Sequence, residues 1–308
     1  MSSDRDVMML SMARTPFGRF GGALKSLSAI QLGALAMAEA SLRSNIESSD
    51  IQFVCAGIGM IGANVLTATR QALLLGSGLL ETVPSMGVDR ACCSGMTAIG
   101  MGMRELQSGE ADVVLCGGFE SLSNTPFLWP RQRGIRPGSV EVSDPLLLRA
   151  DFLDTAIARY TGEEAVRVGI DRTEQDEWAL RSHGRYFAAE REGYFDTERF
   201  AVSVDEDSVT TDESPRPDIQ MEKLAKLKTV YSSPTVTPGN APGLNDGAAF
   251  CVLATRRYVE SRGLKSIATL RGYVQVAGSA TSGSYTPAVG IKKVLGKADT
   301  SLETIDRS

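Results

Sequence analysis

The chain has 308 residues, of which 43% are hydrophobic, and it carries a formal net charge of −5. This length can bury a large core in one or two domains. The acidic balance argues against nucleic-acid binding, no apolar run has the length of a membrane span, and residues 1–6 contain no apolar signal core. We therefore expect a globular, cytoplasmic protein.

The predicted elements alternate between strands and helices in the first part of the chain. Hydrophobic patterning predicts strands over 7–13, 51–56, 83–88 and 112–116, and helices over 32–42, 68–75 and 94–108. The segment 14–22 is a loop because a proline and several glycines interrupt it. The run 112–116 is continuously apolar, which is typical of a strand buried on both faces. Strand, helix and strand over 83–116 form a βαβ unit, so the fold class is α/β.

Cys92 lies where a predicted strand turns into a helix. A thiol at this position feels the positive end of the helix dipole, which favours the nucleophilic thiolate. Ser94 and Gly95 follow it and can offer backbone N–H groups to an oxyanion. The pattern therefore predicts a nucleophile at Cys92. The alternative is that Cys92 and Cys93 are simply small buried apolar residues.

A glycine pattern between the second strand and its helix gives a competing prediction. Residues Gly57–Gly62 fit G-x-G-x-x-G, the turn that binds a dinucleotide pyrophosphate. Asp89 would then be the acid after the next strand. Against this interpretation, a strand and a helix precede the motif, which normally opens the first βα turn of a sheet.

The composition becomes polar after Asn124. Residues 127–138 predict a loop, 163–168 and 173–192 charged helices, and 202–216 an acidic, turn-rich segment. The region is too long and polar for a sheet connection, so we expect it to pass over the mouth of an active site. The alternative is a solvated elaboration without a ligand role. His183, the one histidine of the sequence, lies on a charged helix, where a surface or packing role is expected.

The last part of the chain repeats the first weakly. After a strand over 249–254 and a charged helix over 256–264, residues 267–278 correspond to the first strand and its loop, 287–298 to 29–40, and 301–305 to 46–51. This order predicts duplicated halves, although two unrelated segments of similar periodicity would look alike. A second copy of this length would leave an unpaired strand edge and an uncovered core face. The chain would then be a fragment, or another chain would complete it.

Five cysteines are an odd number, and three of them lie in apolar, strand-like runs. This usage is typical of a reducing compartment and not of a disulfide framework. Cysteines and histidines do not cluster at ligand spacing, so the sequence predicts no metal site.

Several segments resemble thiolases. Residues 90–99, Arg-Ala-Cys-Cys-Ser-Gly-Met-Thr-Ala-Ile, resemble the thiolase nucleophile motif N-x-x-C-x-S-G-x-x-A-I, with Asp89 where asparagine is common. Segments 14–22, 109–124, 172–183 and 235–249 resemble the family in the same order. The resemblance implies a layered αβαβα fold. Residues 1–262 would form the N-terminal domain, with an inserted loop region at about 119–235, and 263–308 the start of an incomplete C-terminal domain.

The resemblance also implies an activity. It predicts a thiolase-type acyltransferase, acting in 3-ketoacyl-CoA thiolysis or acetyl-CoA condensation, with Cys92 as the catalytic nucleophile and Arg216 contacting coenzyme A. Coenzyme A is a substrate there and not a cofactor, and the family implies a homodimer or homotetramer. Pro242 stands where a serine usually contacts the pantetheine amide, and proline cannot supply that hydroxyl.

Three motifs that thiolases carry further along are absent from these 308 residues. They are N-E-A-F-A, G-H-P and C-x-G, which supply an oxyanion-hole asparagine, the histidine base and a second catalytic cysteine. We therefore expect this form to be poorly active or inactive. Two other classes remain open: a nicotinamide oxidoreductase that uses Gly57–Gly62, and a non-catalytic thiolase-like scaffold.

Overall fold

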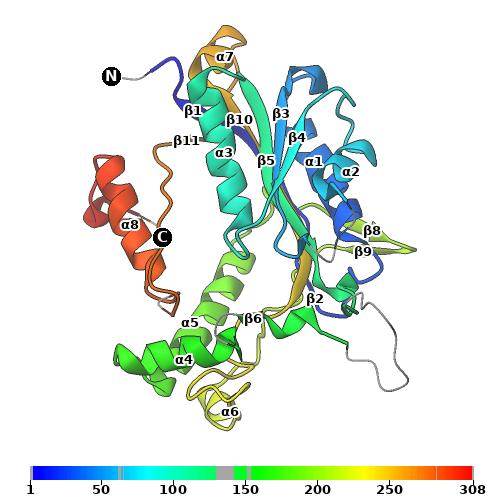
Figure 1. Cartoon of the computed structure of the whole chain (residues 1–308). Coiled ribbons are helices and arrows are strands. Elements are labelled where there is room, and N and C mark those ends of the chain that lie inside the picture. The colour runs from blue at the N-terminus through cyan, green and yellow to red at the C-terminus, as the bar shows by residue number, and fades with distance from the viewer. Residues whose placement is uncertain are drawn as a thin grey trace, which may run out of the picture.

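The computed structural model describes residues 3–61, 64, 66–129, 142–150, 154–281 and 283–306. A seven-stranded sheet forms its centre, and helices lie on both faces (Figure 1). The strands are β1 (Val7–Arg14), β2 (Gly18–Arg19), β3 (Phe53–Gly57), β4 (Ser85–Val88), β5 (Val113–Ser121), β10 (Asn245–Thr255) and β11 (Ala268–Leu270). Their order is β11-β1-β10-β5-β3-β4, and β2 pairs with β10. β3 runs parallel to β4 and β5, whereas β10 runs antiparallel to β5 and β1.

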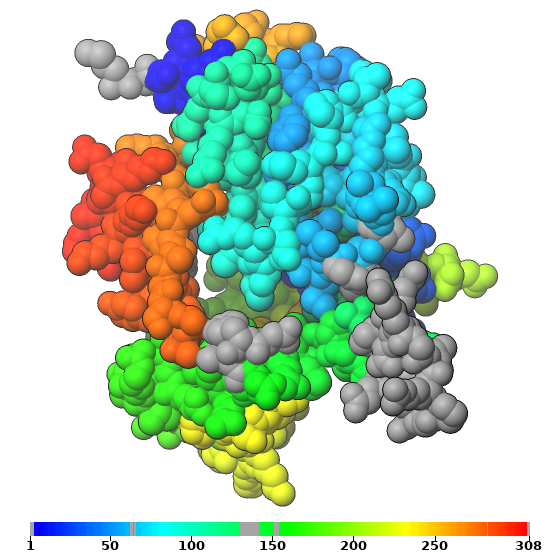
Figure 2. Space-filling model, in the orientation of Figure 1, coloured from blue at the N-terminus to red at the C-terminus, as the bar shows by residue number. Residues whose placement is uncertain are grey.

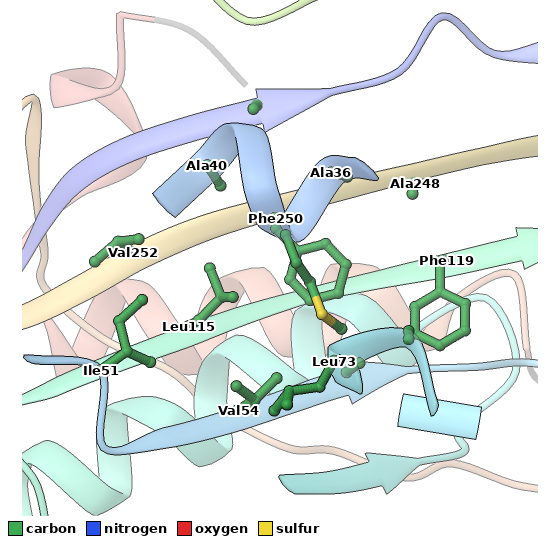
Figure 3. Close-up of a cluster of buried hydrophobic side chains, with 14 of the residues drawn as sticks. Ala36, Ala40, Ile51, Val54, Leu73, Leu115, Phe119, Ala248, Phe250 and Val252 are labelled. Atoms are coloured by element: carbon green, nitrogen blue, oxygen red, sulfur yellow. The ribbon is translucent and has the colours of Figure 1, made fainter. Parts of the chain in front are cut away.

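One face of the sheet is covered by α1 (Ala29–Arg43) and α2 (Ala68–Leu74). A capping box starts α1, because the Ser28 hydroxyl accepts from the Gln31 amide and the Gln31 side chain accepts from the Ser28 amide. Figure 3 shows the core beneath these helices, where the rings of Phe119 and Phe250 stack with centroids 6.3 Å apart. Leu115 is fully buried in the same cluster, and its truncation to alanine would cost about 2–5 kcal/mol.

The other face is covered by α3 (Ser94–Ser108). Three buried cysteines lie side by side here, because Cys55 of β3 and Cys251 of β10 are both register partners of Cys116 on β5. A β-carbon on Gly102 of α3 would stand 2.2 Å from the Cys116 sulfur, so the helix packs directly on this row. Burial raises the pKa of Cys55 and Cys251 to about 12. All five cysteines of the chain are free thiols.

The polar excursion runs from the end of β5 to the start of β10. It contains β6 (Arg149–Ala150), β7 (Thr155–Ala156), α4 (Ile157–Arg167), α5 (Arg172–Arg191), β8 (Val202–Val204), β9 (Asp207–Val209) and α6 (Met221–Ala225). Figure 1 shows α4, α5 and α6 gathered beyond the end of the sheet at which α3 begins. The helix predicted from residue 163 starts earlier, at Ile157, and most of the loop predicted over 127–138 lies outside the described residues. β5 reaches Ser121, past the predicted start of the insertion at 119.

The final segment follows α7 (Arg256–Ser261). β11 pairs antiparallel with β1 at the sheet margin, and α8 (Thr286–Lys297) is followed by a short 3₁₀ turn over Leu302–Thr304. The predicted first copy contains β1, the short β2, α1 and a 3₁₀ turn over Ser48–Asp50 in that order. No residue of α8 is buried. Val289 and Ile291 of this helix are exposed, whereas Val294 and Leu295 are half-buried.

Within the described ranges, no helix combines the length and apolar character that a membrane crossing requires. In the same part of the chain, no group of three or more His, Cys, Asp or Glu side chains is placed to hold a metal ion.

Candidate active site

Cys92 lies exposed in the turn that joins β4 to α3, and Cys93 beside it is exposed as well. The preceding residue, Ala91, has a φ of 48°, in the left-handed region that L-residues avoid at a cost of about 1–2 kcal/mol. The backbone therefore makes a sharp, strained bend immediately before the sulfur. Strain of this kind persists only where surrounding contacts hold it in place.

Side chains on both sides of the bend hold it. The Asp89 carboxylate accepts from the Ala91 amide at 2.9 Å. The Ser94 hydroxyl accepts from the Arg90 amide at 2.8 Å and donates to the Ala91 carbonyl at 2.6 Å. Ser94 is itself buried, and its hydroxyl makes hydrogen bonds to two backbone groups of the turn. The turn thus fixes Cys92 at the positive end of a 15-residue helix.

A glycine at the end of β3 and another within β5 support the start of α3. A β-carbon on Gly57, the last residue of β3, would stand 2.3 Å from the Gly95 nitrogen. A β-carbon on Gly118 of β5 would stand 3.0 Å from the Gly57 carbonyl oxygen and 3.4 Å from the Gly95 α-carbon. Three backbones therefore meet without side chains between them. A larger residue than glycine at position 118 would bring its β-carbon against Gly57 and Gly95.

Glu120, which the sequence analysis did not single out, lies at the same strand end. Its carboxylate accepts from the amides of Gly59 at 2.7 Å and Met60 at 3.0 Å, and from the Asn64 side chain at 3.5 Å. Burial raises the pKa of Glu120; the hydrogen bonds from these donors oppose the rise, and the charge of Asp89 adds to it. The signal in the sequence was a single glutamate after two glycines and a phenylalanine, in an otherwise apolar strand.

These contacts bear on the nicotinamide alternative. A G-x-G-x-x-G turn binds a pyrophosphate through its backbone N–H groups. Here the N–H groups of Gly59 and Met60 donate to the Glu120 carboxylate instead. Gly62, the last glycine of the predicted motif, lies outside the described residues. The following helix begins only at Ala68, after Thr67 in a left-handed conformation. The N–H groups of Gly59 and Met60 are therefore bound within the protein, and α2 begins only at Ala68.

The excursion brings α4 toward the turn that carries Cys92. Figure 2 shows a hollow between the cyan N-terminal end of α3 and the green α4. Tyr160 of α4 lies within electrostatic range of Cys92, since burial first and then the charge of a Cys92 thiolate raise the pKa of its phenol. Tyr160 was also missed from the sequence, because no pattern related it to Cys92.

Arg216, the predicted coenzyme A contact, is exposed on the segment that follows β9, and its amide donates to His183 Nδ1 at 3.1 Å. Burial and the charge of Arg216 lower the pKa of His183. A pocket of about 410 Å³ lies beside them, lined by Leu180, Gly184, Phe187, Glu190, Arg191, Arg216, Pro217 and Ile219. Pro242 is exposed in the loop before β10. The single imidazole of the chain is thus engaged with Arg216.

This chain is similar to known proteins in its sequence. Residues 7–257 match the family model described as thiolase, N-terminal domain. The chain belongs to the thiolase family. An acetyl-CoA acetyltransferase of Schizosaccharomyces pombe is 34% identical over 314 aligned residues, which cover 98% of this thiolase and 78% of the relative. A mitochondrial acetyl-CoA acetyltransferase of Bos taurus is 33% identical, with 97% and 73% covered.

Solved thiolases share the fold. The crystal structure of human mitochondrial 3-ketoacyl-CoA thiolase in complex with CoA superposes with a TM-score of 0.93 at 31% identity, covering 99% of this chain and 79% of that one. The Bacillus anthracis acetyl-CoA acetyltransferase gives a TM-score of 0.90 at 34% identity, covering 98% and 78%. The predicted thiolase-like α/β fold is therefore confirmed, and with it the assignment to a family of acyltransferases.

Proposed function

We propose that this thiolase transfers acyl groups between the sulfur of Cys92 and coenzyme A. The Cys92 thiolate attacks the 3-keto carbon of a 3-ketoacyl-CoA, and the bond between carbons 2 and 3 breaks. The acyl group stays on sulfur as a thioester, while the acetyl-CoA carbanion leaves and takes up a proton. The thiolate of free CoA then attacks the thioester and releases Cys92; condensation of acetyl-CoA is the reverse.

One observation carries this proposal. Cys92 is exposed on a bend at the N-terminus of α3, whereas Cys55, Cys116 and Cys251 are buried inside the sheet. A nucleophile must meet its substrate, and a thiolate is stabilised by the helix dipole at this end. The bend is also held by Ser94 from within, which keeps the sulfur in one place.

The coenzyme A contact is proposed at Arg216. Arg216 is exposed and helps to line the 410 Å³ pocket together with Phe187 and Ile219. A guanidinium suits phosphate groups because it offers several donors in a fixed plane. The human relative is a CoA complex. We propose coenzyme A as a substrate of this chain and no separate cofactor.

We also propose where the chain divides into domains and how active this 308-residue form is. We assign residues 1–262 to the N-terminal domain, with the inserted loop region at about 119–235, and 263–308 to the start of a second domain. The family match over 7–257 and the absence of buried residues in α8 support this division. Because His183 is bound to Arg216, we propose that another group must activate Cys92. This 308-residue form would then acylate slowly and turn over poorly.

Self-association is proposed through the margin of the sheet at β4. Among the described residues, the buried hydroxyls of Thr69 and Ser85 have no hydrogen-bond partner. Both line a cavity of about 730 Å³ beside this margin. Nearby leucines are exposed, with 85% for Leu66 and 52% for Leu74. An open edge strand with apolar residues beside it is suited to pairing with a second copy.

We therefore propose a homodimer, or a homotetramer built from such dimers, in the cytoplasm. The five free thiols favour a reducing compartment. Light scattering of wild type and Leu74→Lys tests the interface: the variant should shift toward monomer. An unchanged mass for a well-folded variant would move the interface elsewhere.

The nucleophile is tested by trapping. The protein is incubated with acetyl-CoA, quenched in acid and digested, and the acetylated cysteine is located by mass spectrometry. We expect the acetyl group on Cys92, its loss in Cys92→Ser, and its retention in the matched control Cys93→Ser. An acetyl group on Cys93, Cys116 or Cys251 in wild type would refute the assignment.

A further inference from the structure

We propose that His183 is a positioning residue, which fixes the main chain at Arg216 and thereby aims the guanidinium toward coenzyme A. This inference rests on the proposed role of Arg216. The contact that carries it is the hydrogen bond from the Arg216 amide to His183 Nδ1, at 3.1 Å.

The sequence around Arg216 makes this hydrogen bond unusually important. Arg216 lies between Pro215 and Pro217, and proline has no backbone N–H. The Arg216 amide is therefore the single main-chain donor of residues 215–217. His183 accepts from that donor, so this contact ties the main chain of the segment to α5.

The other end of the same segment is held firmly. The Tyr186 hydroxyl, one turn further along α5 from His183, donates to Asp212 at 3.0 Å. Arg14 of β1 donates to both oxygens of Asp212, at 2.8 and 3.1 Å. Asp212 thus connects the segment to the sheet. The stretch between Asp212 and Arg216 is fixed at both ends, and His183 supplies the fixed point at the Arg216 end.

The hydrogen bond also sets the protonation of the imidazole. Because Nδ1 accepts, it carries no proton, and the neutral ring has its proton on Nε2. Arg216 is the cation beside the ring, Asp212 is paired with Arg14, and Asp218 is paired with Lys223 at 3.1 Å. Protonation would place an N–H against the Arg216 N–H and a second cation beside the guanidinium. Positioning should therefore be lost at acid pH.

The test measures binding of coenzyme A by calorimetry at pH 7.5 and at several lower pH values. His183→Ala removes the acceptor, and we expect the Kd for CoA to rise roughly 3- to 10-fold, the effect of one hydrogen bond. His183→Asn offers an amide oxygen near the position of Nδ1 and does not titrate. This variant should bind within about twofold of wild type. It should also lack the acid weakening that we expect of wild type, which begins below the usual histidine pKa because burial and Arg216 lower the pKa of His183.

Arg216→Ala and the double variant separate the two proposals. If Arg216→Ala binds CoA as wild type does, the proposed role of Arg216 fails. If Arg216→Ala weakens binding and His183→Ala does not, the positioning role fails. We expect His183→Ala to have no further effect in the Arg216→Ala background, because it acts through that side chain. A full effect in both backgrounds would overturn the inference, and unchanged thermal unfolding of each variant excludes a general loss of folding.

Discussion

The α-carbon of Gly57 lies so close to Gly95 that a β-carbon on it would stand 2.3 Å from the Gly95 nitrogen. The last residue of β3 therefore carries the first turn of α3 directly, backbone on backbone. The distance between the sheet and the turn that carries Cys92 depends on this contact. A side chain at position 57 would have to push the helix start, and Cys92 with it, away from the strand ends.

Gly57→Ala should therefore destabilise the protein by about 3 kcal/mol, the cost of forcing an atom into a closely packed interior. Urea unfolding followed by circular dichroism measures the change. The matched control is Gly296→Ala, which adds the same methyl group in α8 where no atom lies within 4 Å. That substitution should stabilise the helix by up to about 1 kcal/mol. Equal effects at both positions would contradict the packing argument.

Ser94→Ala should destabilise the turn that carries Cys92. The substitution removes the acceptor of the Arg90 amide and a donor to the Ala91 carbonyl, in two part-buried hydrogen bonds made by a buried side chain. We expect a loss of about 1–2 kcal/mol in the free energy of unfolding and roughly tenfold slower acylation of Cys92 as the sulfur becomes less well placed. Quenched-flow acylation and urea titration measure the two effects.

Its control lies at the other end of the same helix. The exposed hydroxyl of Ser108 donates to the Glu105 carbonyl, and Ser108→Ala should change stability by less than about 0.5 kcal/mol. Normal acylation by Ser94→Ala would show that the strained bend does not need this hydroxyl.

Native alkylation should distinguish the thiols by burial. Iodoacetamide at pH 7 should modify only Cys92 and Cys93, because Cys55 and Cys251 are buried and burial raises the pKa of both to about 12. After denaturation all five cysteines should react. Peptide mass spectrometry locates the labels. Modification of Cys116 in the folded protein would show that the sheet opens more readily than its packing indicates.

Acid should remove the stabilisation supplied by Asp212. Burial would raise the pKa of this carboxyl, but hydrogen bonds from Arg14, the Phe17 amide and Tyr186 outweigh it and hold the pKa below the usual 3.8. A carboxyl with a lowered folded-state pKa stabilises the protein above its unfolded-state pKa and loses this effect as pH falls through the folded-state value. Asp212→Asn should cost about 3 kcal/mol at pH 7, and the difference from wild type should shrink below about pH 4.

Denaturant titrations between pH 3 and pH 7 measure this difference. The control is Asp218→Asn, whose carboxylate pairs with Lys223 on the surface with 78% of its side chain exposed. We expect little change there, because water and salt screen exposed pairs. A penalty for Asp212→Asn that grows on acidification would have the wrong sign for this mechanism.

Elements whose cause is local were predictable from the sequence. The helix over 94–108 was, since apolar spacing and Gly109 mark both its face and its end. α4 was predicted too short, because its N-cap, Ala156, makes no side-chain capping bond that would mark the start. Two hydrogen bonds, from Gly59 to Glu120 and from Arg216 to His183, join residues that are far apart in the chain. Such contacts exist only once the sheet and the excursion are folded, and one sequence contains no periodicity that reports them.

The row formed by Cys55, Cys116 and Cys251 has a practical consequence for handling the protein. Once denatured, the chain exposes all its sulfurs together, and oxidation could then join them in pairs that the native sheet does not contain. A chain cross-linked in this way could not restore three unbroken neighbouring strands. Recovery of native protein from denaturant should therefore depend on the presence of a reductant, even though no disulfide is formed or broken in the folded molecule.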